Sequence, residues 1–309
     1  MSTFIREKSF VDCGGPGASV PVGKLIPKNL FKLGIRFVRV VTTVEGMRDA
    51  QSTEHGLLRK YVDECLQAGL RVIVDNHTDF ADPSDVYRLP YQMYQIGKVW
   101  QEYKAKDVAL QFKNEARFRG GRELPTEQYE SFEYSCVSAL RASNPIDGVR
   151  WVVAGNPGLN GYDWFSLLSK GKYKPMKTDR LIVPAHDYNP FNVTHPYSYQ
   201  YARTQSVDEE YPPTNLSSFE YKDYLNAELH VKNYDAWCVA NNVYPFIGEF
   251  GCWDTVKNHI QCKLDKISLY KKYQIPFAIW EFRGKFGLGK YDDTKNSVEH
   301  VEVLKAMVS

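Results

Sequence analysis

Seven short runs of β-branched and aromatic residues constrain the fold of this chain most strongly, because each is followed by a polar loop and then by a stretch with helical spacing. Strands that are nearly all apolar and alternate with helices indicate a parallel sheet covered on both faces. The runs are IRFVRVV (35–41), LRVIVDNH (70–77), VALQFKNE (108–115), VRWVVAGN (149–156), RLIVPAHDY (180–188), YPFIGEF (244–250) and IPFAIWEF (275–282).

The stretches between these runs carry a helical repeat. Over 52–69 the apolar residues fall on one helix face, and Gly69 supplies a stop signal. Similar patterns predict helices over 126–143, 222–242 and 259–273.

A closed barrel needs an eighth strand, and KSFVDCGG (8–15) is the only candidate near the start of the chain. Pro16, Pro21 and Pro27 follow it closely, so the first helix is expected to be short or irregular.

The length of 309 residues allows either one large α/β barrel or two ordinary domains. No linker rich in Pro, Gly and Ser divides the chain, although 203–221 is a long polar insertion. We therefore predict an α/β fold, a (β/α)8 TIM barrel with an irregular first βα unit, as a single catalytic domain over residues 1–309.

Polar residues stand at the C-terminal ends of five of the expected strands. In a (β/α)8 barrel these ends converge on one face, where the active site is built. A doubly wound sheet would hardly gather residues from five strands at one switch point. The residues at these ends are His77, Asn114 with Glu115, His186 with Tyr188, Glu249, and Trp280 with Glu281.

Glu115 and Glu249 are expected to approach each other across the barrel mouth. A close pair of carboxyl groups suits glycoside hydrolysis, in which one acts as general acid and the other, kept ionised, as nucleophile or base. Arg39 and Tyr188 are placed to favour the ionised form of one carboxylate. Trp280 offers an apolar face for a sugar ring.

Composition excludes several other classes of function. Lys+Arg 39 against Asp+Glu 37 gives a net charge of +2 without runs of like charge, so neither nucleic acid nor a membrane surface is indicated as a partner. The six cysteines show no CxxC pair, so a zinc site is not expected and free buried thiols are favoured over disulfides.

Four motifs in order resemble glycoside hydrolase family 5, the cellulase family of a clan of barrels with paired catalytic glutamates. They are QFKNEAR, HDYNPFNVTH, IGEFG and WEFRGKFGLG, and the resemblance runs from about Leu30 to the end of the chain. It implies that Glu115 is the acid/base and Glu249 the nucleophile, and that Asn114 contacts the sugar 2-hydroxyl. Arg39, His77, His186, Tyr188 and Trp280 match the remaining active-site positions of the family.

The chain departs from the family pattern at three places. Ala116 stands where the family often has proline after the glutamate, and His77 is followed by Thr78 where the family frequently has a second histidine. FVDCGGPGAS (10–19) replaces the usual start of the first strand, so subsites formed there are not carried over.

The resulting hypothesis is a retaining β-glycoside hydrolase that cleaves a β-linked polysaccharide. An endo-β-1,4-glucanase ranks first, a β-mannanase or another β-glucanase second, and a glycan-binding barrel without turnover is the alternative from another class. Retention requires the two carboxyl groups about 5–5.5 Å apart. We expect no cofactor, no metal and a monomer.

Other polar and aromatic residues are assigned lesser roles. Glu281 follows Trp280, so it is expected to face the surrounding helices and form a salt bridge there. Asp75, Asp79, Asp187 and His195 are expected to fix loops or support the catalytic residues. Trp164 and Trp253 are candidate sugar platforms.

The sequence leaves localisation open. The start, MSTFIREKSFVDCGG, lacks the continuous apolar core of a signal peptide. A cytoplasmic location is expected for the chain as written, and secretion for a re-engineered mature form.

Overall fold

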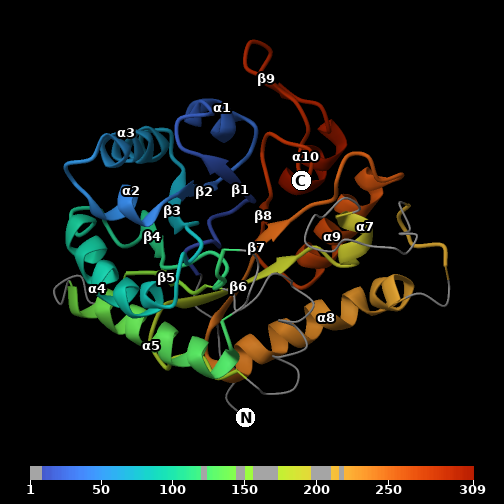
Figure 1. Ribbon diagram of the computed structural model, residues 1–309. Helices are drawn as coiled ribbons and strands as arrows, with labels where there is room; N and C mark the ends of the chain where they lie inside the picture. The colour runs from blue at the N-terminus through green and yellow to red at the C-terminus, as the bar shows by residue number, and fades with distance from the viewer. Residues whose placement is uncertain (1–8, 120–123, 144–149, 156–172, 196–209, 216–218) are drawn as a thin grey trace.

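Eight parallel strands form one sheet in the part of the chain that the structure describes, and their order is β7-β6-β5-β4-β3-β2-β1-β8. The structure is a computed structural model that describes residues 9–119, 124–143, 150–155, 173–195, 210–215 and 219–309 (Figure 1). The strands are β1 (Gly17–Pro21), β2 (Phe37–Thr42), β3 (Arg71–Asn76), β4 (Val108–Gln111), β5 (Val152–Val153), β6 (Leu181–Asp187), β7 (Tyr244–Phe250) and β8 (Ala278–Ile279).

The sheet curls into a barrel because its two ends meet. β8 pairs with β1 through Gly17 and Ala278, and an isolated bridge joins Ile247 of β7 to Phe277, next to β8. Apart from this closure, each strand pairs with the strand that precedes or follows it in the chain. The predicted (β/α)8 barrel is confirmed.

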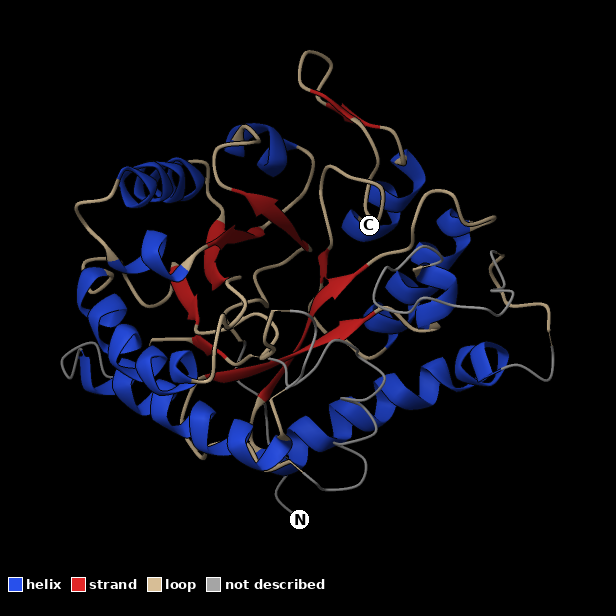
Figure 2. Ribbon diagram, viewed as in Figure 1, coloured by secondary structure: helices blue, strands red, loops and turns tan. Residues whose placement is uncertain are grey.

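Helices surround the strands (Figures 1 and 2). They are α1 (Pro27–Lys32), α2 (Val44–Arg48), α3 (Thr53–Gln67), α4 (Ser84–Val99), α5 (Thr126–Ser143), α7 (Phe191–Thr194), α8 (Phe219–Asn241), α9 (His259–Lys272) and α10 (Val301–Val308). A short hairpin of β9 (Tyr291–Asp292) and β10 (Ser297–Val298) precedes α10. Among the described residues, none of the helices has the length and apolar character needed to cross a membrane.

The first strand is not where the sequence placed it. The strand is Gly17–Pro21, whereas Phe10 and Val11 of the expected strand 8–15 are buried in a cluster with residues from inside the barrel, such as Phe37. Gly17 is needed in this strand because a Cβ built on it would stand 2.1 Å from the Phe37 ring. The helix that follows, α1, has six residues, so the expectation of a short first helix is confirmed.

The inside of the barrel is filled by side chains from successive strands. Phe37, Ile73, Ala109, Val153, Ile182, Phe246 and Ala278 supply one residue each from β2, β3, β4, β5, β6, β7 and β8 to this cluster. A larger cluster joins the outward faces of the strands to the helices. The inside of the barrel is therefore a packed apolar core, and the polar side chains of the candidate site lie at its C-terminal rim.

Glu133 of helix α5 is a buried carboxyl group on a helix outside the sheet. It accepts hydrogen bonds from the hydroxyls of Tyr129 and Tyr173 and, at 2.9 Å, from the Met176 backbone N–H. Burial raises the pKa of Glu133 to about 7, although the three hydrogen bonds oppose the rise. The folded protein therefore holds a proton here at pH values where the unfolded chain does not.

We expect replacement of Glu133 by glutamine to flatten the pH dependence of stability. Because the folded pKa lies above the unfolded one, the contribution of Glu133 to stability is largest below pH 4.5 and falls as the pH rises toward 7, by about 1.4 kcal/mol per unit. A neutral amide at this position removes that slope. Urea unfolding at pH 5 and pH 8 measures the difference, with exposed Glu127→Gln on the same helix as control. An equal slope in the two variants would contradict the assignment.

Candidate active site

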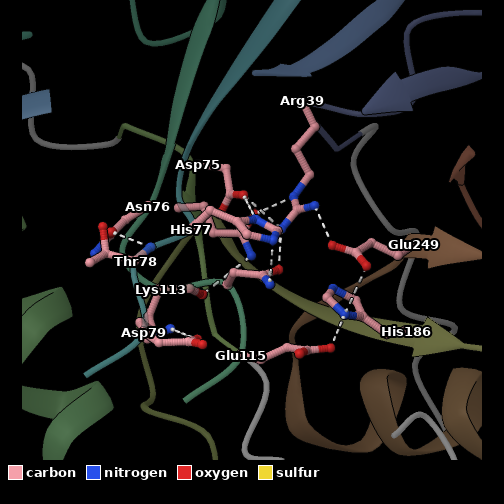
Figure 3. A network of polar contacts seen from close by, with 12 residues as sticks. Arg39, Asp75, Asn76, His77, Thr78, Asp79, Lys113, Glu115, His186 and Glu249 are labelled. Atoms are coloured by element: carbon pink, nitrogen blue, oxygen red, sulfur yellow. Dashed lines mark hydrogen bonds and ion pairs between the residues drawn. The ribbon is translucent and has the colours of Figure 1, made fainter. Parts of the chain in front are cut away.

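The side chains predicted to act together meet at the C-terminal ends of the strands. Figure 3 shows Arg39, His77, Glu115, His186 and Glu249 in one network of polar contacts. Asn114, Tyr188 and Trp280 join it through hydrogen bonds to Arg39 and Glu249 and through ring stacking on His77. The structure thus brings together all eight residues that the sequence singled out.

Arg39 of β2 is the centre of this network. Its Nη1 donates to Glu249 Oε1 at 2.7 Å and its Nε to Gln111 Oε1 at 2.8 Å, while Nη2 donates to Asn114 Oδ1 and lies 2.9 Å from Asp75 Oδ2. The guanidinium is fully buried. Burial opposes its charge, but Asp75 and Glu249 outweigh this effect and raise the pKa of Arg39, so it stays positive.

Glu249 of β7 is held as a carboxylate. Burial would raise its pKa, but His186 and Arg39, together with the Tyr188 hydroxyl that donates to Oε2 at 2.9 Å, lower the pKa to about 2. Burial, and after it the charge of Glu249, raises the pKa of Tyr188, so the phenol keeps the proton that it donates. The free-energy cost of burying this carboxylate in an apolar strand is therefore offset by Arg39, His186 and Tyr188.

A register shift places His186 of β6 beside Glu249. The shift lies between Ala185 and His186, and it pairs His186 directly with Glu249 on the neighbouring strand. Gly248 makes room for the imidazole, because a Cβ built there would lie 3.3 Å from His186 Nε2. His186 thus lies on β6, between β7, which carries Glu249, and β4, beyond which Glu115 lies.

His186 also links the two glutamates. Its Nδ1 lies 3.0 Å from Glu115 Oε1 and 3.6 Å from Glu249 Oε2. One carboxylate oxygen of each glutamate and one nitrogen of His186 all lie within 4.8 Å of one another. The 4.8 Å limit applies to the nearest oxygens, whereas the expected separation of about 5–5.5 Å applies to the carboxyl groups, so the retaining geometry stays a prediction.

His77, which follows β3, connects to the network through both ring nitrogens. Nδ1 lies 2.8 Å from Asp75 Oδ2, and Asn114 Nδ2 lies 3.2 Å from Nε2. Since the Asn114 oxygen accepts from Arg39, its amide nitrogen donates to Nε2, and a neutral His77 then carries its proton on Nδ1. The ring stacks on Trp280 with centroids 5.2 Å apart and planes at 9°.

Helix α9 supports the end of β6 from outside the barrel. Lys266 Nζ lies 2.7 Å from Asp187 Oδ1, and the Tyr270 hydroxyl donates to Oδ2 at 2.7 Å. Because Asp187 stands between His186 and Tyr188, these contacts fix the backbone that carries both side chains.

Sequence reasoning missed two residues that contact the network. Gln111 accepts from Arg39, and Arg117 Nη1 lies 2.8 Å from Glu115 Oε2. A polar residue inside a short apolar run could have revealed Gln111. A cation two residues after a strand-end glutamate could have revealed Arg117, because side chains at that spacing share a face of an extended segment.

The expectation for Glu281 is wrong. Within the described part of the chain it has no ion pair, and burial, followed by the negative charge of Glu249, raises its pKa. Strand β8 ends at Ile279, so the alternation used to turn Glu281 away from the mouth no longer applies at Trp280.

Of the two tryptophans that were candidate sugar platforms, the structure describes only Trp253. Trp253 packs edge-on against Phe286, with ring centroids 4.7 Å apart. Trp164 lies outside the described residues.

Glu115, His186 and Glu249 also form a group with the donor atoms and spacing to hold a metal ion. Three of their four carboxylate oxygens already accept from or pair with cations or a hydroxyl. Arg39 takes one Glu249 oxygen, Tyr188 the other, and Arg117 takes Glu115 Oε2. The two guanidinium charges beside the group oppose the binding of a further cation, so its chemistry is better described as that of a carboxylate pair.

Comparison with known proteins agrees with this geometry. The family model described as cellulase (glycosyl hydrolase family 5) matches residues 26–286. Endoglucanase 1 of Ruminococcus albus is 24% identical over 251 residues, which cover 75% of this chain and 56% of the relative. Endoglucanase C of Acetivibrio thermocellus is 25% identical over 292 residues, covering 81% and 80%. The chain spans little more than half the length of the two Ruminococcus albus relatives it matches.

Solved structures share the fold at lower identity. An endoglucanase superposes with a TM-score of 0.74 at 20% identity over 97% of this chain and 98% of its own. Cel5A of Thermotoga maritima, in complex with cellobiose, gives a TM-score of 0.73 at 18% identity over 96% and 98%.

Proposed function

Because the chain belongs to glycosyl hydrolase family 5, we propose that it is a retaining β-glycoside hydrolase that cleaves a β-linked polysaccharide, with β-1,4-glucan as the first candidate substrate. One observation carries the proposal: two carboxyl groups on β7 and just beyond β4 have oxygens within 4.8 Å of each other, and one of them, Glu249, is held ionised.

The two glutamates take different parts in this mechanism. Glu249 attacks the anomeric carbon while protonated Glu115 gives its proton to the leaving oxygen, which forms a covalent glycosyl-enzyme. Glu115 then removes a proton from water, whose oxygen attacks the same carbon and releases Glu249. Two inversions leave the configuration unchanged.

The surrounding residues set these roles. Arg39 and Tyr188 hold the charge on Glu249, which suits it to act as the nucleophile. Asn114, fixed between Arg39 and His77, is placed to contact the sugar 2-hydroxyl. Trp280, stacked on His77, is the proposed platform for the sugar ring. The protein acts without a cofactor and as a monomer.

The names and bound sugars of the similar proteins favour two candidate polysaccharide substrates. The matched curated proteins are named endoglucanases, and Thermotoga maritima Cel5A has been crystallised both with cellobiose and with mannotriose. We therefore propose endo-β-1,4-glucanase activity first and β-mannanase activity as the second candidate.

Hydrolysis of soluble β-1,4-glucan, β-mannan and xylan, with product anomers followed by NMR, tests the proposal. The β-anomer of the product is expected to appear first. Hydrolysis is expected to be most rapid on β-1,4-glucan. A 2-deoxy-2-fluoro cellobioside with an activated leaving group is expected to label the protein, and peptide mass spectrometry is expected to find the label on Glu249, because a slowed second step traps the intermediate.

Three results would contradict the proposal. An α-anomer formed first would exclude retention. A label on another residue would exclude Glu249 as the nucleophile. Binding of these glycans without any turnover would identify a glycan-binding barrel instead.

A further inference from the structure

Arg117, the last residue of the QFKNEAR motif, is a charged contact of Glu115 to which the proposed mechanism gives no role. Its Nη1 lies 2.8 Å from Glu115 Oε2. The side chain is 22% exposed and that of Glu115 is 9% exposed, so this ion pair is only partly screened by solvent.

The loop after β4 fixes Arg117 in this position. Its backbone N–H donates to the Glu115 carbonyl at 2.8 Å, and its carbonyl accepts from the Phe80 N–H at 3.0 Å. Phe80 and Phe118 form a parallel bridge and pack ring against ring at 5.5 Å. The loop after β4 therefore runs alongside the loop after β3.

Asp79, on the loop after β3, anchors the guanidinium. Arg117 Nε donates to Asp79 Oδ1 at 3.1 Å, and buried Lys113 Nζ lies 3.8 Å from the same oxygen (Figure 3 shows Lys113 beside Asp79). One nitrogen of Arg117 thus binds Asp79 while another reaches Glu115. This two-point attachment orients the guanidinium toward the acid/base carboxyl group.

Charged groups of both signs and one phenol face Glu115. Arg117 and Lys113 come from its own segment, while His186 of β6, Tyr188 beyond β6 and Glu249 of β7 face it across the barrel mouth. Glu249 contributes a negative charge and Arg117 a positive one. These two charges act in opposite directions on the group that must change its protonation state twice in each turnover.

We propose that Arg117 is a positioning residue that orients Glu115 and stabilises its ionised form, so that it sets the upper pH limit of the first chemical step. The inference rests on the proposed function. In that step the proton of Glu115 passes to the leaving oxygen as the bond from C1 to that oxygen breaks and the bond to Glu249 forms. Arg117 stabilises the carboxylate that results, which is also the form that accepts a proton from water in the second step.

The pH profile of kcat/KM for a cello-oligosaccharide tests this role, because its upper limb reports protonation of the free enzyme. In Arg117→Gln the limb is expected to move to higher pH by about one unit or more, because a neighbouring cation no longer opposes the proton. Arg117→Lys keeps the charge and is expected to leave the limb close to the wild-type position. Arg119→Gln, an exposed arginine of the same loop, is the matched control and is expected to leave it unchanged.

An aryl cellobioside with a highly acidic phenol identifies the proton that the limb reports. Its leaving group departs without a proton from Glu115, so the upper limb is expected to weaken in the wild type and in all three variants. Thermal unfolding verifies that each variant is folded. If Arg117→Gln does not fold, Arg117→Met takes its place, since the methionine keeps an unbranched apolar stem in the loop.

The possible outcomes separate this inference from the function beneath it. An equal loss of activity at every pH in Arg117→Gln, with the limb unmoved, would make Arg117 a loop support only and overturn the inference. Equal shifts in Arg117→Gln and Arg119→Gln would show a general charge effect and overturn it too. Absence of turnover by the wild type would instead overturn the proposed function.

Discussion

Replacing Glu249 by glutamine is expected to lower kcat/KM on soluble β-1,4-glucan by at least about 10⁴-fold, because the amide cannot form the covalent intermediate. The substitution keeps the shape of the side chain, and its oxygen can still accept from Arg39 Nη1, while Arg39 Nη2 keeps its contact with Asp75. The folded state should therefore persist. Initial rates together with thermal unfolding measure the two effects separately.

Exposed Glu302 of α10 provides the matched control, and Glu302→Gln is expected to keep the wild-type rate. Retention of more than about a tenth of the wild-type kcat/KM in Glu249→Gln would exclude the carboxylate as nucleophile.

Azide and an activated aryl glycoside distinguish the two glutamates by stereochemistry. In Glu249→Ala, azide is expected to displace the leaving group directly and give the α-azide. In Glu115→Ala, it is expected to attack the covalent intermediate and give the β-azide. The reverse assignment of products would exchange the two roles.

Replacing Arg39 by methionine is expected to lower the free energy of unfolding by about 3–5 kcal/mol, the second large effect. The guanidinium is fully buried and pairs with Asp75 and Glu249 together, so its loss removes the cation that these two buried carboxylates share. Activity is expected to fall as well, because Glu249 loses a partner that keeps it ionised. Urea unfolding at neutral pH and initial rates measure the two consequences.

Arg39→Lys tests how much of this effect is charge. A lysine keeps the charge but not the fork that reaches Gln111, Asn114 and Glu249 at once, so we expect a smaller loss of stability than in Arg39→Met. Arg88→Met is the control, because Arg88 is 3.7 Å from Asp85 on the surface of α4 and such pairs contribute about 1 kcal/mol or less. Equal losses in Arg39→Met and Arg88→Met would contradict the central role of Arg39.

The strands that carry the site could be predicted because their apolar runs are long or end in conspicuous polar residues. YPFIGEF became β7 over the predicted bounds, and the helix over 126–143 was also confirmed residue for residue. The first strand failed this test. GASVP contains glycine, serine and proline and lacks a strand signature, while the apolar Phe10 and Val11 nearby fill the inside of the barrel instead.

Contacts made outside regular strands could not be predicted in the same way. The position of Glu281 depends on the chain after β8, where strand alternation has ended. The contact of Arg117 with Glu115 depends on Asp79, 38 residues earlier, and on a bridge between two loops. No local pattern encodes such pairings.

The sequence alone determined the barrel, the family resemblance and the eight residues of the candidate site. The hydrophobic period is a local property of the sequence, and the barrel topology brings the C-terminal ends of all the strands to one face. Only the tertiary structure decided the charges of that site. The ionisation of Glu249 and the cation that faces Glu115 both depend on distances of a few ångströms between side chains up to 210 positions apart. Electrostatic effects are strong over such distances because the region is buried.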